Sequence, residues 1–248
     1  MSRVVVSYYG KMDYNELITE IHKIPFDRKG IIENLSRLLK HAKYLEEREE
    51  VDDPLARGLL ESAPSFIRKQ IERLQLHLDD EADIIAWISR SLMELLFMLR
   101  YMYSSRERYD EIIKEQLKDL KDIENMLYSD GAPSEDAPEE VKVFHSDMKK
   151  LWEAMQGYGI DRDELKKINQ ASHYAQGAGL IDDYRHAWKI HSKYVHPTSY
   201  LLFGRRNFVY GDGIRLFFWV LAQYYAARNL RDLHRMIEAA LNQVTSPN

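Results

Sequence analysis

The segment IIAWISRSLMELLFMLRYM, residues 84–102, constrains the fold more than any other, because it is apolar on nearly every side of a helix. Arg90, Glu94 and Arg100 interrupt it. Each of these charges would cost about 2.5 kcal/mol or more at the centre of a bilayer. We therefore expect a helix buried inside a soluble protein, with no membrane association.

A second apolar helix is expected at residues 214–227, and both helices need other helices around them. The one convincing linker, the acidic and proline-containing stretch 129–140, leaves too few helices on either side to cover them. We therefore predict one all-α domain over residues 1–248, a single-domain bundle of about eight helices with the linker inside it. The stretch LLFGRRNFVYGDG predicts a small hairpin near 201–210.

Composition narrows the class of protein. Of the 248 residues, 45% are hydrophobic and 30% are charged, which is typical of globular chains. The net charge of −5 provides no bulk attraction for nucleic acid, so any such contact needs a local basic face. Cysteine is absent, which excludes disulfides, thiolate catalysis and cysteine-ligated zinc. The first residues lack the apolar core of a signal peptide, so we expect a cytoplasmic protein.

Local signals predict several helix ends. Asp27 is an N-cap for the helix that follows it, and Pro54 opens the next one. Pro64 is expected to divide or kink that helix, because proline removes a backbone hydrogen bond. Ser104 and Ser105 can cap the helix after the apolar segment.

The stretch YRHAWKIHSKYVHPTS, residues 184–199, has three histidines within eleven residues. On a regular helix one stripe carries polar side chains, at the spacing of Arg185, Lys189, Ser192 and His196. A second stripe is aromatic and aliphatic and includes His191, which we interpret as a core histidine with satisfied hydrogen bonds. His186 is expected in solvent. For His196 a functional role and a structural one both stay open.

Arg90 and Glu94 are four residues apart on one face of the apolar helix. One interpretation is an internal ion pair, although desolvation can cancel the stabilisation that such a pair provides. The other is a polar network or active site in which the pair meets Lys189, Ser192 and His196 on the later helix, since buried polar groups need partners.

Metal and cofactor motifs are scarce. Neutral imidazole is a good metal ligand, but no HExxH occurs, and di-metal helical bundles need Glu-x-x-His on two helices. The single sequence Asp183-x-x-His186 is a weak match. We expect no metal and no cofactor.

The segments ISRSLMELLFMLRYM and WKIHSKYVHPTS together resemble a bacterial family known as domain of unknown function 5677, over about residues 80–200. Its members tend to carry arginine-x-x-x-glutamate on one helix and serine-x-x-x-histidine on a later element. These positions match Arg90, Glu94, Ser192 and His196. The resemblance implies no particular activity.

The later segment is also similar, more distantly, to the HEPN superfamily of helical nucleotide-binding and RNase domains, in which an arginine precedes a histidine at a dimer interface. Two registers fit: Arg185-x5-His191, whose side chains diverge by about 120° on a regular helix, and Lys189-x6-His196, which shares a face but has lysine for arginine. Lysine lacks the planar fork that binds phosphate bidentately.

The HEPN resemblance implies metal-free RNA cleavage. His196 would be the general base or acid at the ribose 2′-hydroxyl, and Lys189 or Arg185 would stabilise the charged phosphorane. Arg205 and Arg206 would hold backbone phosphates, unless they form only a solvated hairpin tip.

From these observations we expect a HEPN-like metal-independent RNase or nucleotide-binding module with an RNA or nucleotide ligand, in bacterial stress or phage defence. The alternative is a non-enzymatic helical interaction protein whose Arg/Glu/Ser/His network is structural. A homodimer is expected because the last helix carries apolar residues almost all the way round, at Phe217, Phe218, Trp219, Val220, Leu221, Tyr224 and Tyr225. The competing expectation is that residues 1–60 cover this helix within one chain.

Overall fold

In a computed structural model of the chain, the residues described are 19–47, 54–79, 82–127, 133–157, 165, 170–195 and 211–244. Of these residues 88% are helical, in nine helices labelled α2 to α10, and none is in a strand. The prediction of an all-α helical bundle is confirmed. The hairpin predicted near 201–210 lies outside the described residues.

The chain forms two compact units. The large unit is Met1–Ser104 with Ala171–Asn248, and the small unit is Ser105–Gln170. A single domain over residues 1–248 stays a prediction. The helices of the large unit are α2 (Arg28–Glu46), α3 (Pro54–Leu76), α4 (Ala82–Ser104), α7 (Ala171–Gly177), α8 (Ile181–Asp183), the π-helix η2 (Tyr184–Trp188), α9 (Lys189–Val195) and α10 (Gly211–Val244).

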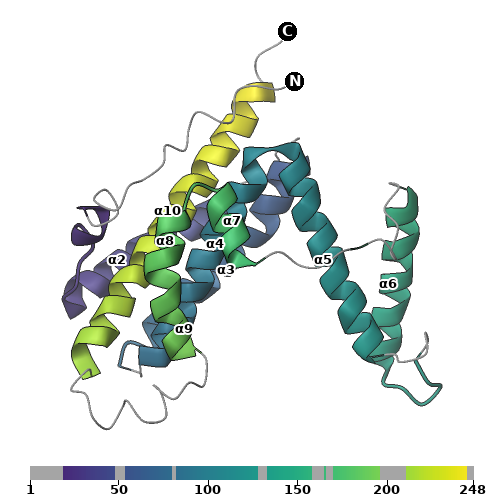
Figure 1. Cartoon of the computed structure of the whole chain (residues 1–248), viewed down its shortest axis with the longest axis horizontal. Coiled ribbons are helices and arrows are strands. Elements are labelled where there is room, and N and C mark those ends of the chain that lie inside the picture. Colours follow the sequence, from purple (N-terminus) through teal and green to yellow (C-terminus); the bar gives the residue numbers. More distant parts are fainter. Residues whose placement is uncertain are drawn as a thin grey trace. The chain divides into compact units, whose positions relative to one another are not determined.

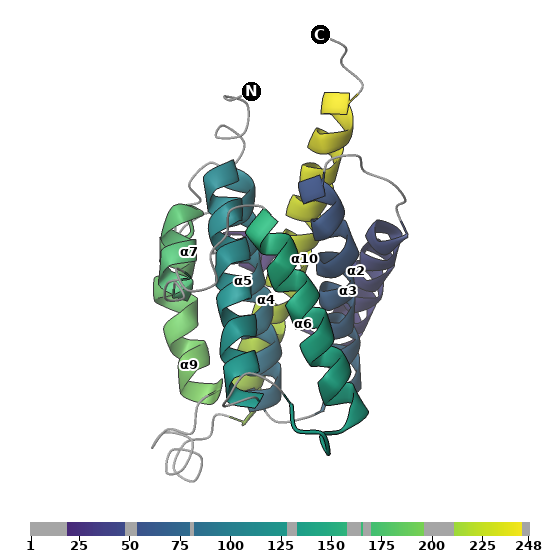
Figure 2. The same ribbon diagram turned by 90° about the vertical axis from the view of Figure 1, so that its right-hand side faces the viewer.

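The centre of the large unit is the pair α4 and α10, which pack against each other along much of their lengths. Figures 1 and 2 show α7 and α9 on one side of this pair and α2 and α3 on the other. The segment 84–102 therefore lies in α4 as a buried helix, as predicted. Among the described residues no helix is both long and apolar enough to cross a membrane.

The apolar residues of α10 are buried within one chain. Phe218 and Tyr225 are fully buried, and Trp219 and Tyr224 nearly so. The covering helices are α4, α2 and α3, two of which come from the first part of the chain. Part of this cover comes from α2, within residues 1–60, as the competing expectation had it, and more comes from α4. The homodimer stays a prediction. Among the side chains of α10 that the structure describes, Ile214, Leu216 and Val220 are half-buried and the large apolar residue Phe217 is exposed, at 36%.

Most predicted helix ends are confirmed. Asp27 caps α2, where its side chain accepts a hydrogen bond of 2.9 Å from the backbone N–H of Gly30, and Pro54 opens α3. The hydroxyl of Ser105 accepts a bond from the N–H of Arg108 at the start of the next helix.

Pro64 was expected to divide or kink its helix, and the division is wrong. Pro64 lies inside α3, which continues from Pro54 to Leu76. Ala63, Ile67 and Ile71 around it are buried, and burial of such side chains contributes more than the hydrogen bond that proline removes.

The small unit contains α5 (Arg106–Leu127) and α6 (Glu139–Gly157). Leu117 of α5 packs in a small apolar cluster with Met148 and Trp152 of α6. The indole N–H of Trp152 donates a 2.9 Å hydrogen bond to the buried carboxylate of Glu124. A polar partner thus fixes the orientation of the largest side chain in this cluster.

Candidate functional site

The helical stretch 181–195 contains a π-helix at its middle. In η2, Tyr184–Trp188, the turn is wider than in an α-helix and its hydrogen bonds join residues five apart. The buried positions are Asp183, Ala187 and His191, four residues apart. Of the two stripes expected from a regular helix, Arg185 and Lys189 of the polar stripe are exposed, and His191 of the aromatic stripe is buried.

His191 is a core histidine, as predicted. It has no exposed surface. Its Nδ1 lies 2.7 Å from the carbonyl oxygen of Ala187, so Nδ1 carries the proton, and its Nε2 accepts from the hydroxyl of Ser89 at 2.8 Å. Burial lowers the pKa of His191 to about 4. A neutral, enclosed imidazole whose nitrogens both have hydrogen-bond partners cannot act as acid or base on a ribose. In the register Arg185-x5-His191 the histidine therefore cannot take part in cleavage.

Arg90 and Glu94 form the predicted ion pair. The Arg90 Nε donates to the Glu94 carboxylate at 2.8 Å, and the side chains are 15% and 35% exposed. The indole N–H of Trp188 donates to the same carboxylate oxygen at 3.1 Å. The guanidinium of Arg90 also lies over the Trp188 ring, 4.9 Å from its centre.

The two helices predicted to pair do pack together, since α9 contacts α4. The structure shows Trp188 as a partner of the Arg90–Glu94 pair on the later segment. Ser192 is half-buried in α9 and Lys189 is exposed. His196, Arg205 and Arg206 lie outside the described residues.

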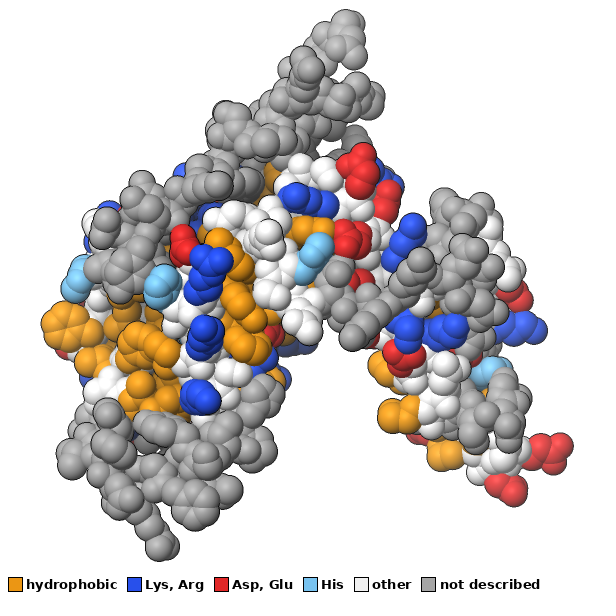
Figure 3. All heavy atoms as spheres, viewed as in Figure 1, with side chains coloured by type: hydrophobic (Ala, Val, Ile, Leu, Met, Phe, Trp, Pro, Cys, Tyr) orange, Lys and Arg blue, Asp and Glu red, His pale blue; other side chains and the backbone are white. Residues whose placement is uncertain are grey.

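The outer face of this segment is basic. Arg185, Lys189 and Lys193 are all exposed, and they follow one another at intervals of four residues. Figure 3 shows Lys and Arg side chains in a column over α8 and α9. We call these three residues the cation row. Arg185 lies 3.5 Å from Asp182, and both side chains are largely exposed.

His186 is exposed beside the cation row, as predicted. Its Nδ1 donates to the carbonyl oxygen of Asp182 at 2.7 Å. The rings of Tyr184 and Trp188 stack at 5.1 Å on the same segment and are half-buried. Positive charge and aromatic surface therefore lie on one short stretch of chain.

Two buried ion pairs were not predicted from the sequence. Arg228 of α10 contacts Asp183 at 3.0 Å, with each side chain only 2% exposed, and also donates to the hydroxyl of Tyr224. Arg100 of α4 contacts Asp232 of α10 at 2.7 Å. Burial raises the pKa of Asp183, against the attraction of Arg228 and Arg100.

These pairs join α8, α4 and α10 beneath the cation row. Arg100 inside the apolar segment was a visible signal, because a charge there needs a partner. Its partner, 132 residues later, has no local signature.

The geometry places a largely buried polar network on the inner side of 181–195 and a row of exposed cations on its outer side. The inner network positions the segment, and the outer face is available to phosphate or carboxylate groups. Comparison with known proteins found no matching family, curated protein or solved structure, so both resemblances seen in the sequence stay predictions.

Proposed function

We propose that this chain is a HEPN-like helical module that binds RNA along the cation row. The supporting observation is the alignment of Arg185, Lys189 and Lys193 on one exposed face. With a net charge of −5 the chain needs a local basic face to hold a polyanion, and the cation row is such a face.

The side chains of the row suit a phosphodiester backbone. Arg185 offers a planar fork that can bind a phosphate bidentately, and the two lysines offer point charges. Tyr184 and Trp188, half-buried on the same segment, add some aromatic surface beside the row. Single-stranded RNA fits this arrangement better than duplex RNA, because only its bases are free to stack.

Catalysis is the second step of the proposal. His196 would remove the proton from the ribose 2′-hydroxyl, whose oxygen would then bond to the adjacent phosphorus. Lys189 or Arg185 would stabilise the charge on the phosphorane. The P–O5′ bond would break to leave a 2′,3′-cyclic phosphate, and the 5′-oxygen would take a proton from water. Arg205 and Arg206 would extend the phosphate contacts. This chemistry needs no metal.

Binding is tested by fluorescence anisotropy with a labelled single-stranded RNA at several salt concentrations. Replacing all three cations by glutamine should weaken binding and reduce the slope of log K against log salt by about 2. The matched control replaces Lys23, Lys29 and Lys40, three exposed lysines in or near α2, and should leave the slope unchanged. An equal loss in both variants would show a net-charge effect and reject the cation row.

Cleavage is tested separately, with chelator present and a panel of single-stranded RNAs. The parent should cleave, and His196→Ala should abolish cleavage while the circular dichroism spectrum is retained. Cleavage that persists in the variant, or that no RNA elicits, removes the RNase step and leaves the binding step standing.

The second candidate function is a non-enzymatic interaction protein. It is favoured by the network on the inner side, where His191, Ser89, Arg90, Glu94 and Trp188 all have partners within the chain. A homodimer stays a proposal for either function. Failure of RNA binding in the anisotropy experiment would favour this candidate.

A further inference from the structure

Four polar residues of α10 lie in one row in the interior of the large unit. Tyr225, Arg228, Asn229 and Asp232 follow the spacing i, i+3, i+4 and i+7, which places them on one side of the helix. Each of them is 2% exposed or less. We call these four residues the buried polar row. Since buried polar groups cost free energy unless they have hydrogen-bond partners, each polar atom of the row needs one.

Three of the four side chains are held through one part only. One terminal nitrogen of Arg228 donates to Asp183 at 3.0 Å. The amide nitrogen of Asn229 donates to two backbone carbonyl oxygens, at 2.7 and 2.8 Å. One oxygen of Asp232 accepts from Arg100 at 2.7 Å. These bonds fix the side chains, so their other polar atoms cannot turn towards solvent.

Among the described residues, the other polar atoms of the row have no hydrogen-bond partner. They are the Tyr225 hydroxyl, Nε and Nη2 of Arg228, Oδ1 of Asn229 and Oδ1 of Asp232. Seven buried side-chain atoms of this kind occur in the described part of the chain, and five of them belong to this row. Five such atoms within about two helical turns mark a site at which a further molecule completes the hydrogen bonds.

The atoms without partners include both donors and acceptors. Arg228 offers N–H groups that donate, whereas Asn229 and Asp232 offer oxygens that accept. The hydroxyl of Tyr225 can do either. A ligand that only accepts would leave the oxygens unpaired, and a ligand that only donates would leave the guanidinium unpaired. The ligand must therefore both donate and accept.

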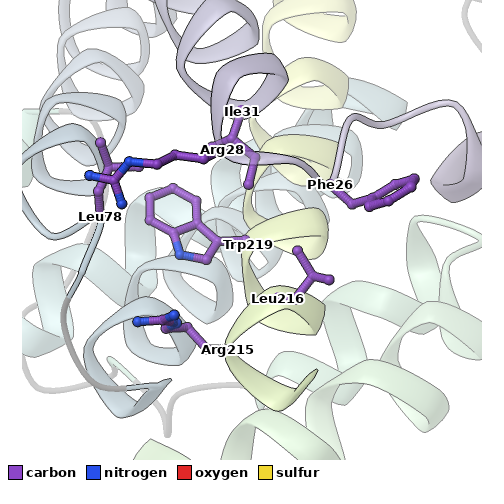
Figure 4. Close-up of a pocket in the computed structure, with 7 residues that line it drawn as sticks. All are labelled: Phe26, Arg28, Ile31, Leu78, Arg215, Leu216 and Trp219. Atoms are coloured by element: carbon purple, nitrogen blue, oxygen red, sulfur yellow. The ribbon is translucent and has the colours of Figure 1, made fainter. Parts of the chain in front are cut away.

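Charge and space exclude ions and larger molecules. Two ion pairs meet at the row, Arg228 with Asp183 and Arg100 with Asp232, and their charges cancel. An added ion would leave an uncompensated charge in the interior, which is costly. A cavity of about 220 Å³ at the start of α10 (Figure 4) has no residue of the row in its lining. Because the row itself has almost no exposed surface, its ligand is a very small neutral molecule.

We propose that the buried polar row binds internal water. Water accepts hydrogen bonds from the free N–H groups of Arg228 and donates to the free oxygens of Asn229 and Asp232, with about three bonds for each molecule, as is usual for buried water. The hydroxyl of Tyr225 completes the set. Through Arg228 this water supports the ion pair with Asp183, and so belongs to the framework that positions segment 181–195. The proposal does not depend on RNA binding.

The first test uses the full chain with ¹⁵N at the Nε of arginine, and measures NOEs and ROEs between water and each Nε–H. The Nε–H of Arg228 should give an ROE to water, which differs in sign from an exchange peak. The matched control is the Nε–H of Arg100, which is also buried but already donates to Asp232, and its cross peak should be much weaker. Equal cross peaks at the two arginines, or none at Arg228, would overturn the proposal.

The second test removes one hydroxyl of the row. Tyr225→Phe should lower the Tm by about 2–4 °C, because the variant loses a hydrogen bond to water. Tyr224→Phe is the reference, since its hydroxyl accepts a bond from Arg228, and its Tm should fall by a similar amount. If the Tyr225 hydroxyl had no water, its removal would relieve the cost of burying it and the Tm would rise. A Tm for Tyr225→Phe at or above that of the parent therefore contradicts bound water.

Discussion

At the scale of single residues, the most consequential contact joins Asp183 to Arg228. Both side chains are almost fully buried, and the carboxylate contacts the guanidinium directly at 3.0 Å. Removing one partner of a buried pair leaves the other charge in an apolar interior, which costs far more than the pair contributes. Sequence reasoning missed this pair because the two residues are 45 positions apart.

Asp183→Ala should lower the free energy of unfolding by about 3–5 kcal/mol, because Arg228 would stay buried without its carboxylate. Urea denaturation followed by circular dichroism measures this change. Asp182→Ala is the matched control, since Asp182 is 47% exposed and should cost less than about 1 kcal/mol. Glu94→Ala should fall between them, because Arg90 keeps the Trp188 ring. Equal effects at 182 and 183 would contradict the buried pair.

The buried imidazole of His191 makes stability depend on pH. Its pKa is about 4 in the folded chain, lowered chiefly by burial, against about 6.5 when unfolded. The unfolded state therefore binds more protons between these values, so stability is complete above pH 6.5 and is lost as the pH falls towards 4. The loss should reach about 3 kcal/mol.

His191→Gln should remove this part of the pH dependence. The measurement is the free energy of unfolding between pH 7 and pH 5 for parent and variant, in the same buffer series. His186, which is exposed, provides the control substitution, and His186→Gln should leave the parent profile unchanged. A parent profile that is flat over this range would contradict a depressed pKa.

At the scale of elements, a few neighbouring residues were enough to predict where helices begin, because the start of a helix depends on the backbone groups of its first turn. Asp27 and Pro54 begin helices because their side chains suit the first turn. Pro64 and η2 could not be predicted in the same way. Proline inside α3 and a π-turn in 184–188 are stabilised by helices that pack against them, so their signals lie elsewhere in the chain.

Asp27→Ala should destabilise the chain by about 1 kcal/mol, because the N–H of Gly30 would lose its acceptor. Thermal unfolding measures the shift. Asp27→Ser keeps a hydroxyl oxygen at the cap and should recover most of the stability. A serine variant as unstable as the alanine variant would show that the cap bond is not the cause.

At the scale of the whole molecule, the fold class followed from one requirement, namely that two apolar helices need cover. The structure meets this requirement for α10 with α2, α3 and α4 of the same chain. Sequence reasoning could not choose between cover from the same chain and cover from a second copy, because both bury the same side chains. For the candidate site, the pairing of α4 with α9 was predictable and the partner Trp188 was not.

Substitution of Phe217, an exposed aromatic residue of α10, should not change the oligomeric state. Phe217→Ser removes the large apolar side chain at 36% exposure, while the buried side of the helix stays intact. Light scattering at micromolar concentration should give the same mass for parent and variant, whether that mass is 29.3 kDa or a multiple of it. A lower mass in the variant would show that α10 takes part in a dimer interface.

The two-sided construction of 181–195 has a consequence for evolution. The residues that fix this segment, Asp183 and His191, face inward, and those of the cation row face outward. Substitutions on the outer face therefore leave the fold almost untouched. Selection can change the charge of this surface, and with it the ligand, one residue at a time and without an intermediate that fails to fold. In a library of single substitutions, positions 185, 189 and 193 should accept nearly any residue that suits a helix, while 183 and 191 should accept few.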